Sequence, residues 1–308
     1  MSPATVQSFT LLDGTAIPWL GWGNGTGAAS TTAVESGKIA LESGILHLDT
    51  AQIYHNEKET GEAITAAGVP REEVYVTSKL SARPNQIPVP LAEARASVQE
   101  SLDRLGFVPD LYLIHNPYVA EPGHLKALWA LFEALKDEGK LKSIGVSNFR
   151  PQDLAVILDG AKYKPVVNQI EYHPYVLTHL APLLEFQQQH GIITQSYGTL
   201  TPTLRHPTGG PLKPILERIA ARVSTTTGTS LDASAVLLLW ARAQGVVVVT
   251  ASGNADRIKG LAKLAALPAG LLTPEEVEEI SAVGKTVHFR FYTEHLENEF
   301  PLPDLPSQ

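Results

Sequence analysis

Four side chains that together could move a proton follow three successive apolar segments. Asp49 and, one loop later, Tyr54 follow the first, Lys79 ends the segment VYVTSK, and His115 ends the segment LYLIH. An ammonium group beside a phenol lowers the pKa of the phenol, and a neighbouring carboxylate keeps that ammonium charged. A tyrosine tuned in this way can donate a proton to a carbonyl oxygen near neutral pH, with an imidazole orienting the carbonyl. The set predicts an acid-catalysis site.

Each of these residues also has a structural interpretation. A tyrosine in a loop commonly serves packing, an aspartate after a strand often caps a helix, and a strand-end lysine is usually solvated. A histidine such as His115 can be a hydrogen-bonded core residue. The position of all four residues at consecutive strand ends is what favours a shared site.

The elements that must position these side chains alternate along the chain. Short apolar runs lie at 17–21, 46–48, 74–76, 111–114, 143–146, 166–167, 192–193 and 246–249. Amphipathic stretches of helical length lie at 31–43, 91–105, 124–138 and 231–243. This alternation of about eight βα units, each of ~30 residues, is typical of a (β/α)₈ TIM barrel. Active sites of such barrels lie where the strands run into the βα loops.

Two segments interrupt this alternation. Residues 198–229 are rich in Pro, Gly and Thr and are long enough to form a functional loop, and the tail from residue 288 onward combines aromatic and acidic residues. No linker separates two halves of the chain, so residues 1–308 are expected to form a single barrel domain.

The composition excludes several classes of protein. The 308 residues contain 24 Lys and Arg, 32 Asp and Glu, and no Cys, which gives a net charge of −8. Disulfides and thiolate chemistry are therefore excluded, and an acidic surface disfavours nucleic-acid binding. No secretory signal or membrane-spanning run is recognisable, which predicts a soluble, cytoplasmic protein. His47, Asp49 and His55 lack the spacing of a metal site, so no metal is expected.

A glycine-rich loop allows a different fold. Alternating glycines in LGWGNGTGA, followed later by Asp49, suggest a doubly wound dinucleotide-binding domain. The spacing differs from G-x-G-x-x-G, and that fold would leave four other polar residues without a shared site: Lys79, His115, Gln169 and Tyr197. The glycines are better explained as a loop at a barrel mouth.

Several ordered motifs resemble the aldo-keto reductase family. They are LDGTAIPWLGWGNGT, HLDTAQIYHNEKETGEAI, VYVTSK, SLDRLGFVPDLYLIHNP, GKLKSIGVSNF, VVNQIEYHPY and ITQSYGTL. The resemblance implies a TIM barrel with an N-terminal β-hairpin and long βα loops, and hydride transfer from NADPH to a small carbonyl substrate. It implies that Tyr54 donates the proton, Asp49 and Lys79 tune it, and His115 places the carbonyl. A monomer or weak homodimer is expected.

The same resemblance implies a cofactor site. Ser147, Asn148 and Gln169 match the positions that bind the nicotinamide carboxamide, and Tyr197 matches the tyrosine that stacks on the ring, although Ser147 and Asn148 would also serve as a helix cap. The complete set of expected cofactor residues is Asn24, Gly25, Asp49, Ser147, Asn148, Gln169, Tyr197, Gly198, Leu200, Ser252 and Arg257.

The cofactor site also departs from the family pattern. The lysine that usually helps to bind the 2′-phosphate of NADPH is replaced by Ala251, while Ser252 and Arg257 are retained. An arginine can bind a phosphate through its fork of donors, so NADPH is expected to be preferred over NADH.

The substrate pocket departs from the family pattern at two further positions. The usual motifs have a tryptophan where this chain has Ser81 and Asn116. This change predicts a wider, more polar pocket lined by Tyr54, His115 and Asn116, which Trp22 either partly refills or leaves for barrel packing.

The ending GKTVHFRFYTEHLENEF resembles the fungal branch that reduces conjugated polyketones and α-keto amides. This similarity favours activated ketones or α-dicarbonyls as substrates over open-chain sugars. Two alternatives remain at this point: an aldose reductase of the xylose type, and a nicotinamide-binding barrel with a regulatory role and no catalysis.

Overall fold

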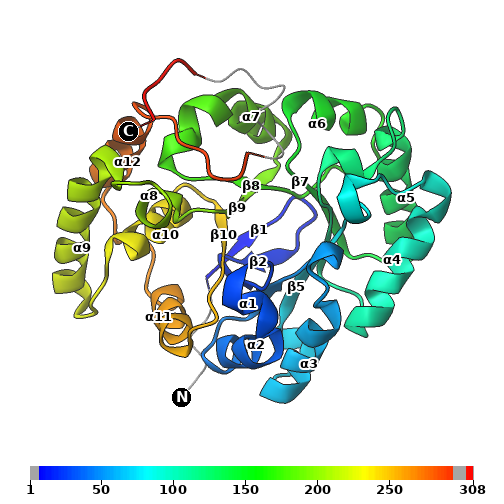
Figure 1. Ribbon diagram of the computed structural model, residues 1–308, viewed down its shortest axis with the longest axis horizontal. Coiled ribbons are helices and arrows are strands. Elements are labelled where there is room, and N and C mark those ends of the chain that lie inside the picture. Colours follow the sequence, from blue (N-terminus) through cyan, green and yellow to red (C-terminus); the bar gives the residue numbers. More distant parts are fainter. Residues whose placement is uncertain (1–6, 294–302, 308) are drawn as a thin grey trace.

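Eight parallel strands close into a barrel in the computed structural model, which describes residues 7–293 and 303–307 (Figure 1). The strands are β3 (Leu20–Gly23), β4 (His47–Asp49), β5 (Tyr75–Leu80), β6 (Leu111–Ile114), β7 (Ser143–Ser147), β8 (Val167–Glu171), β9 (Ile193–Tyr197) and β10 (Val247–Thr250). They pair in sequence order, and β10 closes the ring by pairing with β3, for example Val249 with Gly21. The predicted TIM barrel is confirmed.

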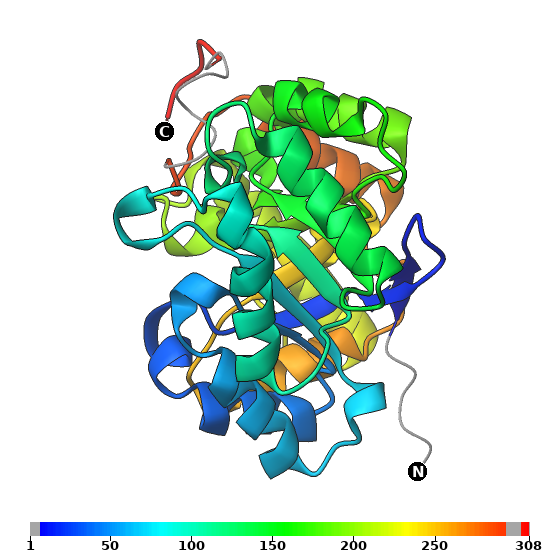
Figure 2. The ribbon, with the colours of Figure 1, turned by 90° about the vertical axis from the view of Figure 1, so that its right-hand side faces the viewer.

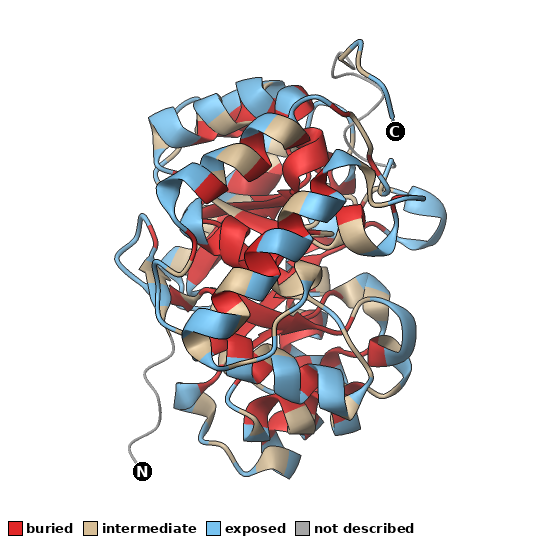
Figure 3. Cartoon of the chain, turned by 90° about the vertical axis from the view of Figure 1, so that its left-hand side faces the viewer, coloured by how far each residue is buried: buried red, intermediate tan, exposed pale blue. Residues whose placement is uncertain are grey.

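Helices surround this barrel and connect each strand to the next. They are α1 (Gly27–Thr31), α2 (Ala33–Glu42), α3 (Glu57–Ala67), α4 (Leu91–Leu105), α5 (Leu125–Asp137), α6 (Pro151–Leu158), α7 (Leu177–His190), α8 (Thr201–Leu204), α9 (Lys213–Thr227), α10 (Ala233–Ala243), α11 (Ala255–Ala265) and α12 (Pro274–Gly284). Their inner faces are buried and their outer faces exposed, as Figure 3 shows. None of the helices within the described ranges has the length and apolar composition needed to cross a bilayer.

A two-stranded hairpin closes one end of the barrel. Strands β1 (Ser8–Thr10) and β2 (Ala16–Pro18) pair antiparallel, and the buried Leu11 and Ile17 pack against the barrel residues Leu111 and Val247. Figure 2 shows the hairpin at the end opposite to the 3₁₀ turn η3 (Pro84–Gln86) of the β5–α4 loop. Because this end is filled with apolar side chains, the open end that carries the βα loops is left for the site.

Two predictions about individual elements were wrong. The strand expected at 17–21 is divided, since Ile17 belongs to the hairpin and the barrel strand β3 begins only at Leu20. The segment 198–229, expected to be a loop, contains α8 and the 15-residue helix α9. In α9, Leu216, Ile219 and Val223 are buried at helical spacing, a pattern obscured by the Pro, Gly and Thr around it. Part of the aromatic and acidic tail, residues 294–302, lies outside the described residues.

Candidate active site

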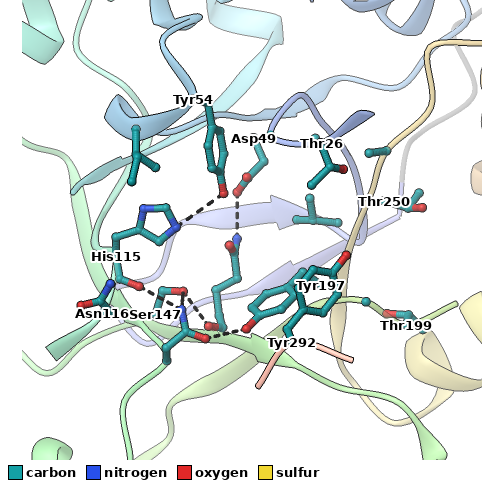
Figure 4. Close-up of a pocket in the computed structure, with 18 of the residues that line it drawn as sticks. Thr26, Asp49, Tyr54, His115, Asn116, Ser147, Tyr197, Thr199, Thr250 and Tyr292 are labelled. Carbon is teal, nitrogen blue, oxygen red and sulfur yellow. Dashed lines mark hydrogen bonds between the residues drawn. The ribbon is translucent and has the colours of Figure 1, made fainter. Parts of the chain in front are cut away.

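A cavity of about 360 Å³ opens at the carboxyl ends of the barrel strands (Figure 4). Side chains from widely separated segments line it, because the strand ends of a barrel converge on one face. Eleven of the residues predicted from the sequence are among them: Gly25, Asp49, Tyr54, His115, Asn116, Ser147, Asn148, Gln169, Tyr197, Gly198 and Leu200.

The floor of this cavity contains a buried ion pair. Lys79 Nζ lies 2.6 Å from Asp49 Oδ1, and their side chains are 0% and 4% exposed. Lys79 also donates to the backbone carbonyl of Thr50 at 2.9 Å. Burial lowers the pKa of Lys79, and the neighbouring Asp49 carboxylate opposes that shift. Lys79 therefore lies beneath the cavity, in contact with Asp49 and Thr50.

Tyr54 and His115 face each other above that ion pair. The Tyr54 hydroxyl lies 3.5 Å from His115 Nε2, and the two rings meet edge-on (Figure 4). Tyr54 ends the 3₁₀ turn η1 (Gln52–Tyr54), which stops where His55 takes a left-handed φ of 57°. A side chain at Gly25 would place its Cβ 2.6 Å from the Tyr54 ring, so glycine there lets the first loop reach the tyrosine.

The predicted lowering of the pKa of Tyr54 is wrong for the structure described. Burial raises the pKa of Tyr54 well above its ordinary value, and Asp49 and Tyr292 raise it further. Lys79 gives its hydrogen bonds to Asp49 and Thr50, and its Nζ lies 5.2 Å from the centre of the Tyr54 ring. Tyr54 consequently keeps its proton at neutral pH.

A hydrogen-bond network joins the expected cofactor residues to the Lys79–Asp49 ion pair. Gln169 Nε2 donates to Asp49 Oδ2 at 2.8 Å, and the Ser147 hydroxyl donates to the Gln169 carbonyl at 2.7 Å. Asn148 donates to Ser147 Oγ and accepts from the Tyr197 hydroxyl at 2.7 Å. Asn148 has a left-handed φ of 59°, a conformation that asparagine tolerates better than most residues. Hydroxyl, amide and aromatic groups thus share one wall (Figure 4).

Trp22 and Asn24, two residues assigned to the site from the sequence, lie outside the cavity. Trp22 is 1% exposed, packs in an apolar cluster with Leu48 and Ile258, and donates its indole N–H to the Ser252 carbonyl. The Asn24 side chain donates to Thr60 of α3 at 2.8 Å. The assignment of Trp22 to the substrate pocket is corrected to a packing role, whereas Asn24, whose side chain holds the first loop to α3, stays a predicted cofactor residue.

The expected phosphate-binding residues lie beside the cavity, where α11 begins. Thr250 and Ala251 line the cavity, and Arg257 Nε donates to Ser252 Oγ at 3.2 Å. Asn254 caps α11 by accepting from the Arg257 N–H. Ser252 and Arg257 are thus held next to each other but outside the cavity wall.

Two residues of the site were not predicted in their present roles. Ser81, 5% exposed, places its hydroxyl 2.8 Å from His115 Nδ1. Tyr292 lines the cavity and meets the Tyr197 ring edge-on at 5.2 Å. The departure from the family motif at Ser81 and the aromatic character of the tail were the available signals.

A second buried carboxylate fixes the segment that carries Tyr292. Glu171, at the end of β8, accepts from Arg290 at 3.1 Å and from the backbone N–H groups of Phe291 and Tyr292 at 3.0 and 3.3 Å. His173 Nε2 lies 3.2 Å from the same carboxylate. Burial would raise the pKa of Glu171, but the contacts with His173, Arg290 and Phe291 hold it below its ordinary value.

Comparisons with known proteins agree with this geometry. Residues 19–285 match the model of the aldo/keto reductase family. The chain is 33% identical to the NAD/NADP-dependent indole-3-acetaldehyde reductase of Schizosaccharomyces pombe, over 92% of this chain and 98% of that protein. It is also 33% identical to human aldo-keto reductase family 1 member C1, over 92% and 93% of the two chains.

A solved structure agrees as well. The crystal structure of an aldo/keto reductase from Brucella melitensis superposes with a TM-score of 0.76 at 32% identity, covering 91% of this chain and all of that one. With the barrel, the cavity and these similarities in place, the chain belongs to the aldo/keto reductase family and is an NAD(P)-dependent oxidoreductase that reduces carbonyl groups.

Proposed function

We propose that this enzyme reduces activated ketones, α-dicarbonyls or aldehydes with NADPH, and that Tyr54 supplies the proton. The observation that carries the proposal is the pairing of the Tyr54 hydroxyl with His115 Nε2 directly above the Lys79–Asp49 ion pair. Two polar groups that point at one spot can bind a carbonyl oxygen, and Tyr54 keeps its proton at neutral pH because burial raises its pKa.

The contacts of the four residues support a role for each of them. His115 orients the carbonyl oxygen next to the Tyr54 hydroxyl, which transfers its proton to that oxygen. Asp49 holds Lys79 beneath the Tyr54 ring, where a positive charge favours the phenolate that the transfer leaves behind. When bound, the reduced nicotinamide supplies the hydride for the carbonyl carbon.

The wall opposite Tyr54 fits a nicotinamide group. A carboxamide needs both donors and acceptors, and the hydroxyl and amide groups of Ser147, Asn148 and Gln169 offer both beside the Tyr197 ring. Hydrogen bonds already orient these groups, since Gln169 contacts Asp49 and Tyr197 contacts Asn148. Gly25, Gly198 and Leu200 complete the proposed site at the loops.

The preference for NADPH depends on Arg257 and Ser252. The related enzyme from S. pombe is described as NAD/NADP-dependent, so family membership alone does not fix the preference. We expect Arg257→Leu to raise the KM for NADPH and leave the KM for NADH unchanged, while Lys259→Met, an exposed substitution in α11, changes neither. A wild-type enzyme that prefers NADH would contradict this assignment.

The proposed substrate class follows from the shape and polarity of the cavity. Asn116 accepts from the Tyr118 N–H at 3.0 Å, which orients its amide and leaves the NH₂ group as a donor next to His115. Ile53 and Leu204 line the cavity and are 39% and 64% exposed, so the entrance is apolar. A second oxygen beside the reacting carbonyl would meet Asn116, and an apolar body would meet the entrance.

Substrate comparison tests this class. Isatin and a ketopantoyl lactone should be reduced with a higher kcat/KM than xylose. Asn116→Asp keeps the acceptor for Tyr118 but loses the donor, and we expect it to lower kcat/KM for the dicarbonyls by about 10-fold and to spare a simple aldehyde. Better turnover of xylose than of isatin would favour the aldose reductase alternative.

Replacement of the proposed acid tests the activity itself. Tyr54→Phe should reduce the rate of NADPH oxidation with a dicarbonyl by about 10²–10⁴-fold. Tyr118→Phe is the control, because Tyr118 is 40% exposed on the same face of the barrel. A wild-type protein that binds NADPH but oxidises none with any carbonyl would support the regulatory alternative, and equal rates in Tyr54→Phe and wild type would remove Tyr54 from its role.

A further inference from the structure

Ser81 lines the cavity and contacts the ring nitrogen of His115 that does not face Tyr54. Its hydroxyl lies 2.8 Å from His115 Nδ1, while His115 Nε2 faces the Tyr54 hydroxyl. In a neutral imidazole one nitrogen carries the proton and the other accepts, so the partner of Nδ1 determines what Nε2 offers to the cavity.

Ser81 also holds the turn that carries Tyr54. Its backbone N–H donates to Gln52 Oε1 at 2.9 Å, and its hydroxyl oxygen accepts from the Ile53 N–H at 3.4 Å. The Gln52 amide is oriented in turn, because its NH₂ group donates to the Ser97 carbonyl at 2.7 Å. Ser81, the residue directly after β5, is therefore tied to the imidazole and to the 3₁₀ turn η1.

These contacts indicate where the proton of the Ser81 hydroxyl points. The Ile53 N–H can only donate to the Ser81 oxygen, so among the described residues His115 Nδ1 is the one acceptor that the Ser81 O–H can reach. An Nδ1 that accepts leaves the proton of the neutral imidazole on Nε2. His115 then presents an N–H donor to the cavity, as binding of a carbonyl oxygen requires.

We propose that Ser81 is a positioning residue that fixes the orientation and tautomer of His115 and sets its separation from Tyr54. This inference rests on the proposed carbonyl reduction, because its effect on rate is exerted through His115. Ser81 acts through the imidazole, because its hydroxyl is engaged by the Ile53 N–H and by His115 Nδ1.

The test compares two variants of nearly equal volume. Ser81→Thr keeps a hydroxyl, Ser81→Val replaces it with a methyl group, and both are β-branched residues suited to a strand end. Ser78→Ala is the control for loss of a buried serine hydroxyl, because Ser78, on the same strand, contacts Glu57 outside the cavity. Urea unfolding of each variant separates loss of fold from loss of function.

Two readouts decide the outcome. Nitrogen NMR of the imidazole of His115 should show an unprotonated Nδ1 and a protonated Nε2 in the wild type and in Ser81→Thr, and a mixture of tautomers in Ser81→Val. With a fixed carbonyl substrate, kcat should fall about 10-fold in Ser81→Val and recover in Ser81→Thr, while the KM for NADPH stays constant.

The results separate this inference from the proposed function. If Ser81→Val keeps both the wild-type tautomer and the wild-type kcat while Tyr54→Phe is inactive, the function stands and the role of Ser81 is wrong. A fall in kcat without any change at Nδ1 also overturns the role. If the wild type shows no turnover, the proposed function fails, and the NMR comparison still decides whether Ser81 fixes the tautomer.

Discussion

Two buried carboxylates end two strands of the same barrel and differ in the groups that they contact. Asp49 ends β4 and Glu171 ends β8, and their residues are 3% and 0% exposed. Each is paired with a nearly fully buried cation, Lys79 for Asp49 and Arg290 for Glu171, and each has a histidine two residues away.

The two carboxylates differ in the groups that donate their other hydrogen bonds. The second oxygen of Asp49 accepts from Gln169, a side chain of the cavity wall. Glu171 accepts from two backbone N–H groups, those of Phe291 and Tyr292, which are more than a hundred residues away in sequence. A buried ion pair at a strand end therefore does not by itself distinguish a catalytic carboxylate from a structural one. The groups that surround the ion pair make that distinction.

The largest effect is expected for Asp49→Asn. This change leaves Lys79 buried without its counter-charge, which typically costs about 3–5 kcal/mol of the free energy of unfolding. It also removes the positive charge from beneath Tyr54, because an unpaired buried lysine releases its proton, and kcat should fall on the order of 10²-fold. Urea unfolding and steady-state kinetics measure the two effects.

The double variant Asp49→Asn/Lys79→Met is the matched control for this prediction. It leaves no unpaired charge, so a large part of the stability should return while kcat stays low. Recovery of kcat in the double variant would mean that the ion pair is structural, like the contacts of Glu171.

Glu171→Gln should affect stability more than chemistry. Arg290 loses its counter-charge, so we expect the free energy of unfolding to fall by about 3 kcal/mol. The kcat for a small aldehyde should not change, whereas the KM for a bulky ketone should rise because Tyr292 is held less firmly in the cavity. A loss of kcat as large as that of Asp49→Asn would assign Glu171 to the chemistry and end the distinction between the two carboxylates.

The histidine next to Asp49 makes a pH-dependent contribution to stability. Burial lowers the pKa of His47 from 6.5 to about 4. Below pH 6.5 His47 therefore binds a proton in the unfolded chain but stays neutral in the folded chain. The free energy of unfolding consequently falls by on the order of 3 kcal/mol as the pH decreases from 6.5 toward 4. Above neutral pH His47 makes no such contribution. Unfolding midpoints between pH 7.5 and 4 should show a smaller decline for His47→Gln, and an equal decline would show that another group causes it.

The residues around Asp49 could largely be predicted from the sequence. Asp49, Tyr54, Lys79 and His115 lie at strand ends that the alternation of apolar and amphipathic segments locates. Trp22 was misplaced because the direction of a strand side chain changes with every residue. A Cβ at Gly21 would meet the His47 ring and one at Gly23 would meet Val249, both inside the barrel, so Trp22 between the two glycines faces outward.

The contacts of Glu171 were beyond sequence reasoning for a different reason. They join β8 to a segment near residue 290, and no local pattern encodes such a contact. The rise in the pKa of Tyr54 comes mainly from burial, then from Asp49, and only in part from Tyr292 in that segment. The single-domain organisation, the oligomeric state and the cytoplasmic location stay predictions.

The smallest effect is expected for a substitution at Gly198, which follows β9 and lies next to Glu171 and Tyr292. Gly198 has a φ of +66°, and a Cβ there would lie 3.1 Å from Tyr292 Cε2 and 3.3 Å from Glu171 Cγ. Gly198→Ala should cost about 1–2 kcal/mol for the left-handed backbone and more for the crowding, whereas Gly228→Ala, with a φ of +67° and open space around it, should cost the backbone part alone. Urea unfolding of both variants gives the difference. An equal loss of unfolding free energy in the two variants would mean that Tyr292 moves aside freely, so that Glu171 does not fix the segment that carries it. A larger loss in Gly198→Ala, together with a raised KM, would show that Glu171 shapes the cavity by holding that segment against it.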